Sequence, residues 1–251
     1  MPETSWHLFY GGELQGLYGL LIAPLAFLAY RAVAPPDQAR AVVPEATRFV
    51  SILTLVFAVE TAIDPIATGP LVRSEWLAGT LAAQVIPFFF VLLGDLRVLL
   101  LAIGVARPER ALTRNLGWAS GTALLVPITT GLLYGGARLV WPDLPELVLW
   151  MIYELGFFLL CLFLGRVWVA RSLASEPARA SYLRDLLGYS AAYYALWLSA
   201  DCLIVLGELD LGWAIRIVPN QLYYGLWAPF VYARFFWSRP ESATRSPNAS
   251  R

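Results

Sequence analysis

The sequence contains no lysine, one histidine and two cysteines. All 18 basic residues are therefore arginine, and no Schiff base to a lysine side chain can form. The lone histidine, His7, precedes the first apolar segment, where we expect a solvated side chain and not a metal ligand. Cys161 and Cys202 lie inside apolar segments, where thiols usually act as small packing residues. We therefore expect no disulfide, no metal site and no bound cofactor.

Charge of either sign is also scarce. Charged residues make up 14% of the 251 positions and hydrophobic residues 59%, whereas soluble domains usually carry about 25% charged residues. The formal net charge is zero, so the chain has no positive excess with which to hold a nucleic acid. This composition predicts an all-α, polytopic protein of the cell (inner) membrane whose main partner is the lipid bilayer.

Apolar segments long enough to cross a hydrocarbon core of about 30 Å can be delimited by charge and turn signals. There are seven: residues 14–30, 48–70, 77–105, 117–138, 146–168, 186–207 and 213–236. We expect one seven-helix transmembrane domain over residues 1–237. Residues 238–251 are rich in Ser, Pro and Arg, which cannot bury a core, and are expected to form a disordered cytoplasmic tail.

The arginines predict the orientation of these spans. Fourteen fall on the first, third and fifth loops, on the C-terminal tail and on the adjoining helix ends. Three fall on the other side, namely Arg73, Arg138 and Arg216, and Arg97 lies inside a span. Because cytoplasmic loops carry the excess of basic residues, the N-terminus is expected outside and the C-terminus in the cytoplasm.

A repeated spacing suggests internal symmetry. Glu13 and Glu60 are separated by 47 residues, and so are Glu154 and Asp201. The spacing suggests that spans one to three and five to seven are parallel repeats joined by span four. The topology resembles that of the seven-helix transporters of the sugar-exporter and PQ-loop type and that of the microbial rhodopsins. The chain has neither a Pro-Gln dipeptide nor a lysine for retinal, so we assign it to no family.

Carboxylates inside the spans are the main functional signal. Glu60 and Asp64 lie one helical turn apart on the same face of span two, and Glu154 and Asp201 should reach similar depths from spans five and six. A charge at the bilayer centre costs about 2.5 to 3.5 kcal/mol, so such residues usually face a bundle interior or a wet cavity. We predict a polar cavity in the outer half of the bilayer. The candidate ligand- or proton-binding residues are Glu60, Asp64, Glu154, Asp201, Asn220, Arg216 and Tyr223.

Asp95 and Arg97 of span three are expected closer to the cytoplasm, apart from the outer acids. Two residues apart on a helix, their side chains diverge by roughly 200°, so they cannot simply pair with each other. Each needs another partner, as an interhelical anchor or as a gate or headgroup contact. With Arg216 near the outer mouth, Glu60 is expected to have only Tyr, Thr and amide neighbours.

Glycines in span four have the spacing of closely packed membrane helices. Gly117 and Gly121, and then Gly131 and Gly135, are each four residues apart, which allows backbones to approach. Two interpretations remain open: close packing inside the bundle, or the face of a homodimer.

The leading functional prediction is a transporter or ligand-binding membrane protein whose carboxylates bind a proton, a cation or a small polar or lipid-like ligand. One alternative is a membrane enzyme acting on a lipid-linked substrate, with the acids as an acid/base pair or as Mg²⁺ or Ca²⁺ ligands. Another is a structural or assembly subunit of a membrane complex. The acids themselves can also be interpreted as structural, holding helices together through hydrogen bonds. No catalytic residue can be named, because no nucleophile or HExxH motif is present.

Overall fold

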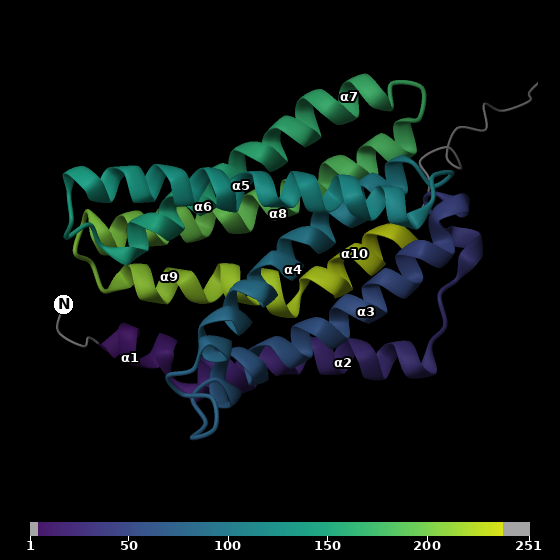
Figure 1. Cartoon of the computed structure of the whole chain (residues 1–251). Coiled ribbons are helices and arrows are strands. Elements are labelled where there is room, and N and C mark those ends of the chain that lie inside the picture. Colours follow the sequence, from purple (N-terminus) through teal and green to yellow (C-terminus); the bar gives the residue numbers. More distant parts are fainter. Residues whose placement is uncertain (1–4, 238–251) are drawn as a thin grey trace, which may run out of the picture.

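The computed structural model describes residues 5–237, and both the first four residues and the predicted tail at 238–251 lie outside this range. Within it, all regular structure is helical (Figure 1). The α-helices are α1 (Ser5–Gly11), α2 (Gly19–Val33), α3 (Thr47–Ile66), α4 (Leu81–Ala106), α5 (Leu112–Val140), α6 (Glu146–Phe163), α7 (Val169–Ser172), α8 (Pro177–Val205), α9 (Leu211–Asn220) and α10 (Trp227–Phe236). The predicted all-α class is confirmed.

Short π-helical turns extend or join several of these helices. They are η1 (Leu14–Tyr18), η4 (Ala67–Leu71), η5 (Leu164–Trp168) and η6 (Gln221–Gly225). The turn η5 links α6 to α7 in one continuous rod, and η6 links α9 to α10. Two 3₁₀ turns, η2 (Gln38–Arg40) and η3 (Pro44–Ala46), lie between α2 and α3.

Five helical stretches are long and apolar enough to cross a membrane. They are Leu14–Val33, Pro44–Leu71, Leu81–Ala106, Leu112–Val140 and Glu146–Ser172. This agrees with a multi-pass membrane protein. The two remaining predicted spans correspond to α8 and to the α9–α10 run, which are not among the five. Charged residues and tyrosines lower the hydropathy of α8, and α9 and α10 have only 10 residues each.

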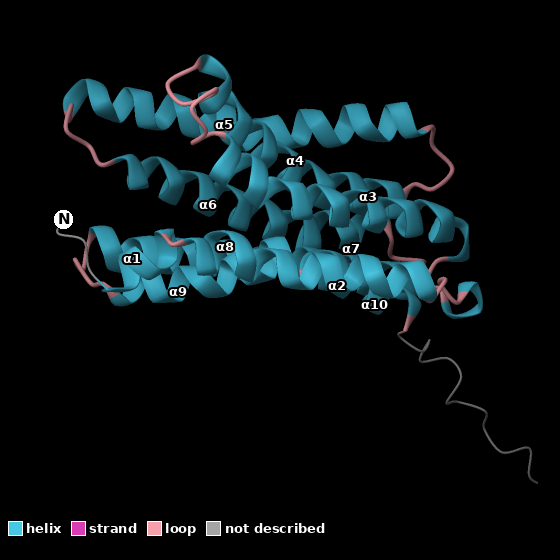
Figure 2. Cartoon of the chain, turned by 90° about the horizontal axis from the view of Figure 1, so that it is seen from below, coloured by secondary structure: helices cyan, strands magenta, loops and turns pink. Residues whose placement is uncertain are grey.

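Successive helices run back and forth between two ends of a bundle (Figures 1 and 2). One end carries α1 and the connections α5–α6 and α8–α9, and we call it the N-terminal end. The connections α2–α3, α4–α5 and α7–α8 lie at the other end. We call this the arginine-rich end, because Arg40, Arg107 and Arg110 lie in these connections and Arg171 and Arg179 flank them.

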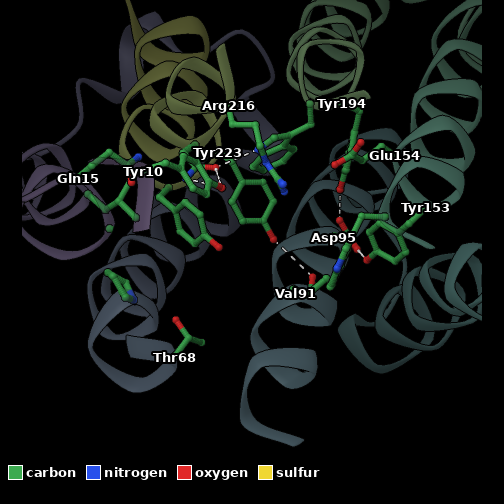
Figure 3. Close-up of a pocket in the computed structure, with 17 residues that line it drawn as sticks. Tyr10, Gln15, Thr68, Val91, Asp95, Tyr153, Glu154, Tyr194, Arg216 and Tyr223 are labelled. Atoms are coloured by element: carbon green, nitrogen blue, oxygen red, sulfur yellow. Dashed lines mark hydrogen bonds between the residues drawn. The ribbon is translucent and has the colours of Figure 1, made fainter. Parts of the chain in front are cut away.

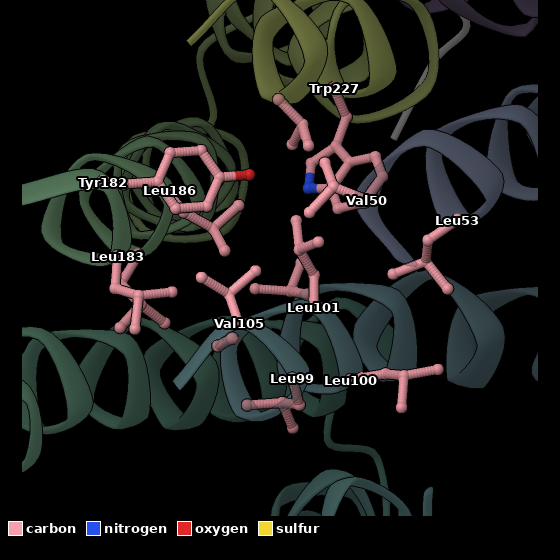
Figure 4. Close-up of a cluster of buried hydrophobic side chains, with 14 of the residues drawn as sticks. Val50, Leu53, Leu99, Leu100, Leu101, Val105, Tyr182, Leu183, Leu186 and Trp227 are labelled. Carbon is pink, nitrogen blue, oxygen red and sulfur yellow. The ribbon is translucent and has the colours of Figure 1, made fainter. Parts of the chain in front are cut away.

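The hydrophobic core is concentrated toward the arginine-rich end. Val50 of α3, Leu101 of α4, Leu183 of α8 and Trp227 of α10 are all fully buried in it (Figure 4). Val50, Leu101 and Leu183 belong to the halves of their helices nearest that end, and Trp227 begins α10, the part of the α9–α10 run that leads toward it. The other half of the bundle is therefore the part left to hold polar side chains.

The glycines of α5 do not pack inside the bundle. A Cβ atom added at Gly117, Gly121, Gly131 or Gly135 would meet no atom within 4 Å. Close packing within the chain, one of the two interpretations of this pattern, is therefore wrong. All four glycines are exposed, and Gly131 borders an open groove between α4, α5 and α6, which leaves the homodimer face as a proposal.

Candidate functional site

A cavity of about 430 Å³ (Figure 3) is lined mostly by residues from the halves of their helices nearer the N-terminal end. We call it the central cavity. Helices far apart in the sequence contribute its wall, including α1, α4, α6, α8 and α9 and the π-helical turns η1 and η6. It is lined by Tyr10, Gln15, Gly16, Leu20, Pro65, Thr68, Val91, Asp95, Trp150, Tyr153, Glu154, Tyr194, Trp197, Arg216, Asn220, Tyr223 and Tyr224.

Irregular backbone brings η6 to this wall. Pro219 near the end of α9 has no N–H to donate, and the following residues form the π-helical turn. Two carbonyl groups of the turn are bound by side chains from other helices. The Tyr189 hydroxyl donates to the Leu222 carbonyl at 2.7 Å, and Arg97 Nη2 donates to the Tyr223 carbonyl at 2.5 Å. These bonds fix the turn that presents Tyr223 and Tyr224 to the cavity.

Glu154 of α6 has a buried carboxyl oxygen at the cavity and no ion pair within residues 5–237. Its side chain is 4% exposed and lines the cavity, and its Oε2 atom has no hydrogen-bond partner in residues 5–237. Its neighbour Asp201, from α8, is fully buried and faces Arg216 of α9, with Arg216 Nη1 3.2 Å from Asp201 Oδ1. Arg216 therefore compensates Asp201 directly. The Glu154 carboxyl group also shares a hydrogen bond with Asp201, which leaves its Oε2 atom available to a ligand.

Asp95 joins three helices at the cavity wall. The hydroxyl groups of Tyr153 on α6 and Tyr194 on α8 both donate to its carboxylate. This corrects the expected position of Asp95 on a separate, cytoplasmic side. The helix α4 begins at Leu81, after the N-cap Thr80, so Asp95 lies near the middle of a 26-residue helix. At this position it lines the same cavity as Glu154.

Arg97 is fully buried and pairs with Glu60 of α3, with Arg97 Nη1 3.3 Å from Glu60 Oε2. Its guanidinium also lies 4.3 Å from the centre of the Tyr223 ring and 4.8 Å from that of Trp227. The expectation that Glu60 has no cationic neighbour is therefore wrong. An arginine side chain is long enough to bridge α4 and α3, and no spacing within one helix can reveal such a pair.

The remaining predicted residues divide between the wall and the layer behind it. Asn220 lines the cavity, and its Oδ1 accepts a hydrogen bond from Trp197 Nε1 at 2.9 Å. Asp64 is 2% exposed and lies near Glu60 in α3, but the cavity lining includes its neighbours Pro65 and Thr68 in its place. Thus Asp95, Glu154, Arg216, Asn220 and Tyr223 line the cavity. Glu60, Asp64, Arg97 and Asp201 lie behind its wall.

Sequence analysis missed Tyr10, Gln15, Trp150 and Trp197. Gln15 is 4% exposed, and neither atom of its side-chain amide has a partner in the described part of the chain. A glutamine at the start of an apolar segment was a signal for it. The two tryptophans gave no such signal, because aromatic residues are frequent throughout this sequence.

Acidic groups outnumber basic groups around the cavity. Five buried or nearly buried carboxyl groups, Glu60, Asp64, Asp95, Glu154 and Asp201, are accompanied by the two guanidinium groups of Arg97 and Arg216. An uncompensated charge in a low-dielectric interior is costly. Within residues 5–237, Asp64, Asp95 and Glu154 are therefore the acids of this group without a guanidinium group in an ion pair.

Two further results bear on the identity of the site. Within residues 5–237, no group of three or more His, Cys, Asp or Glu side chains is arranged to hold a metal ion. No protein-family model, no curated protein and no solved structure matches this chain.

Proposed function

We propose that this chain is a membrane transporter or ligand-binding protein whose central cavity takes a small cation, with protons or a cation as the coupling species. One observation carries the proposal: Glu154 and Gln15 line a cavity of about 430 Å³ with buried polar atoms that lack partners among the described residues. Buried polar groups are nearly always hydrogen-bonded, and exceptions need an explanation. A ligand in the cavity supplies one.

Aromatic residues favour a cationic ligand over an anionic one. Trp150, Tyr153, Tyr194 and Trp197 line the cavity together with Glu154. The faces of aromatic rings attract cations, most strongly when water is excluded. A carboxylate beside several such rings is the usual protein environment for an ammonium group.

The ion pairs Arg97–Glu60 and Arg216–Asp201 have a different role in this proposal. Each joins two helices, and each arginine also lies close to aromatic rings. They position the wall of the site and do not bind the ligand directly. In this proposal Glu60 and Asp201 anchor helices to one another, and Glu154 binds the ligand.

We further propose seven spans in the cell (inner) membrane, with α8 and the α9–α10 run as the sixth and seventh. The back-and-forth course of the chain supports this number (Figure 1). The arginine-rich end is assigned to the cytoplasm by the positive-inside rule, which puts the central cavity in the outer half of the bilayer. The 3+1+3 repeat and a homodimer through α5 remain part of this proposal.

The test uses tetramethylammonium as the probe. Binding of radiolabelled tetramethylammonium is measured on the purified protein, and its uptake is measured in proteoliposomes with and without an imposed pH gradient. We expect saturable binding in wild type and a loss of at least tenfold in affinity for Glu154→Gln, which removes the charge while preserving size. The matched control is Glu146→Gln, on the same helix but exposed and outside the cavity.

The proposal also predicts competition. Protons should reduce tetramethylammonium binding as pH falls, because the same carboxyl groups accept either species. Absence of saturable binding in wild type, or equal binding in wild type and Glu154→Gln, would contradict the assignment of the ligand to this cavity.

A further inference from the structure

We infer that the ligand of the central cavity is amphiphilic: an ammonium head beside Glu154 carries a single hydrocarbon chain, which lies in an apolar groove between α4, α5 and α6. The inference rests on the proposed function and adds the chemical class of the ligand. Its starting point is a second cavity of about 340 Å³, which we call the side groove.

The side groove is apolar. Its lining includes Phe88 and Leu92 of α4, Leu124 and Pro127 of α5, and Leu149 of α6. In the part of the chain that the structure describes, its wall contains no charged side chain, and its polar side chains are Thr130, Trp150 and Tyr153. A hydrocarbon chain fits this surface, and a charged or strongly polar molecule does not.

The side groove adjoins the central cavity directly. Val91, Trp150 and Tyr153 line both of them, so the carboxylate-bearing space and the apolar one share part of their lining. Tyr153 contributes its hydroxyl to Asp95, and Trp150 stacks on Phe88 with ring centres 6.5 Å apart. One molecule with a polar end and an apolar end therefore fits the two spaces together.

The outer side of the groove is accessible from the surface of the bundle. Phe88 is 62% exposed and Leu124 is 40% exposed, both on helices that are long and apolar enough to cross a membrane. In a bilayer, this surface faces lipid tails. The chain of the amphiphile can thus enter from the membrane while its head reaches Glu154. Together the two spaces fall within the usual range of about 300 to 1,000 Å³ for ligand pockets.

The charges around the central cavity favour an ammonium head over an anionic head. The carboxyl groups around the central cavity outnumber the guanidinium groups, and Arg216 already faces Asp201. An anionic head such as a phosphate would add to the negative excess, whereas an ammonium head reduces it. Aromatic rings on the cavity wall add a cation–π contribution.

The experiment compares tetramethylammonium with hexyltrimethylammonium as competitors for bound radiolabelled tetramethylammonium on the purified protein. The two molecules carry the same head, so the ratio of their competing concentrations isolates the effect of the chain. In wild type we expect hexyltrimethylammonium to compete at a concentration at least tenfold lower, since each buried methylene tightens binding by roughly fourfold at best.

Two variants fill the side groove from α5: Gly131→Phe and Leu124→Trp. Each should remove the advantage of the hexyl chain while leaving tetramethylammonium binding within about twofold of wild type. Leu132→Trp is the matched control, because Leu132 lies on the same helix, is 73% exposed and is outside the groove. It should preserve the advantage of the chain.

The outcomes separate the two proposals. If both competitors act at the same concentration in wild type, the amphiphile is ruled out and the small-cation site stands. If the chain is advantageous but equally so in both groove variants, it binds elsewhere and the inference fails. If neither molecule competes and tetramethylammonium does not bind, the proposed function fails as well.

Discussion

Each buried carboxylate in this bundle differs from the others in what surrounds it. Glu60 and Asp201 have guanidinium partners, and Asp95 has two tyrosine hydroxyls. Asp64 Oδ1 and Glu154 Oε2 have no hydrogen-bond partner within residues 5–237, and of these two acids only Glu154 lines the central cavity. Sequence analysis could find these residues, because an acid in an apolar segment is conspicuous. It could not pair them, since the partners come from other helices.

Removing either member of the Arg97–Glu60 pair should destabilise the protein. Arg97→Gln leaves Glu60 without its guanidinium partner, and Glu60→Gln leaves a fully buried guanidinium without its carboxylate. Breaking a buried pair from one side typically costs about 3 to 5 kcal/mol. We expect each single variant to lower the unfolding temperature in detergent. The double variant should recover part of the loss, and strictly additive effects would contradict the coupling of the two residues.

Glu154→Gln should have the opposite effect on stability. The neutral amide removes a poorly compensated acid from beside Asp201, so the ligand-free protein should unfold at a higher temperature than wild type. The same variant should lose the ligand, which makes stability and binding change in opposite directions. A fall in unfolding temperature as large as that of Glu60→Gln would identify Glu154 as another structural anchor.

At the level of elements, the contact between α4 and η6 depends on Gly94. A Cβ atom at this position would lie 1.5 Å from the Tyr223 hydroxyl oxygen, so Tyr223 can approach α4 only because the side chain is absent. The Tyr223 hydroxyl also donates to the Val91 carbonyl at 3.4 Å. Glycine inside a predicted helix usually indicates lower helix stability. Nothing in the sequence shows that a distant residue, Tyr223, packs against this glycine.

Gly94→Ala should therefore destabilise the protein by about 1 to 3 kcal/mol, the usual cost of overpacking. Gly117→Ala is the control, because Gly117 lies within α5 and its Cβ would meet no atom within 4 Å. There alanine should stabilise the helix by up to about 1 kcal/mol. Thermal unfolding should show a lower unfolding temperature for Gly94→Ala and a higher one for Gly117→Ala. An unchanged unfolding temperature in Gly94→Ala would show that Tyr223 can move without cost.

Some helix ends were easier to predict than tertiary partners, but α8 begins at Pro177, nine residues before the predicted span 186–207. The predicted span 146–168 lies within the rod Glu146–Ser172, and 213–236 nearly coincides with the run from α9 to α10. Hydropathy detects a long apolar rod well. The π-helical turns escaped it. The turn η6, for example, follows Pro219, and its carbonyl groups are bound by Tyr189 and Arg97 from other helices.

For the whole molecule, packing and polarity are divided along the bundle axis. Most of the large, fully buried apolar side chains (some are drawn in Figure 4) lie toward the arginine-rich end, and most residues of the central cavity (Figure 3) lie toward the N-terminal end. A tightly packed half can hold the helices in place while the other half opens around a ligand. The positions of the carboxylates in the sequence suggested a cavity. The aromatic residues of its wall could be identified only from the three-dimensional arrangement of the helices.

The orientation in the membrane is predicted from the arginines at one end of the bundle. The arginines near the loops at the arginine-rich end should face the cytoplasm, because the cytoplasmic loops of membrane proteins carry the excess of basic residues. A reporter active only in the cytoplasm, fused after Pro108 in the α4–α5 connection or after Trp237, should be active. One fused after Pro142 in the α5–α6 connection should be inactive. Because Pro108 and Pro142 flank α5, the two fusions should give opposite results if α5 crosses the membrane. Reversed activities would place the central cavity on the cytoplasmic side, so that the ligand of Glu154 would enter from inside the cell.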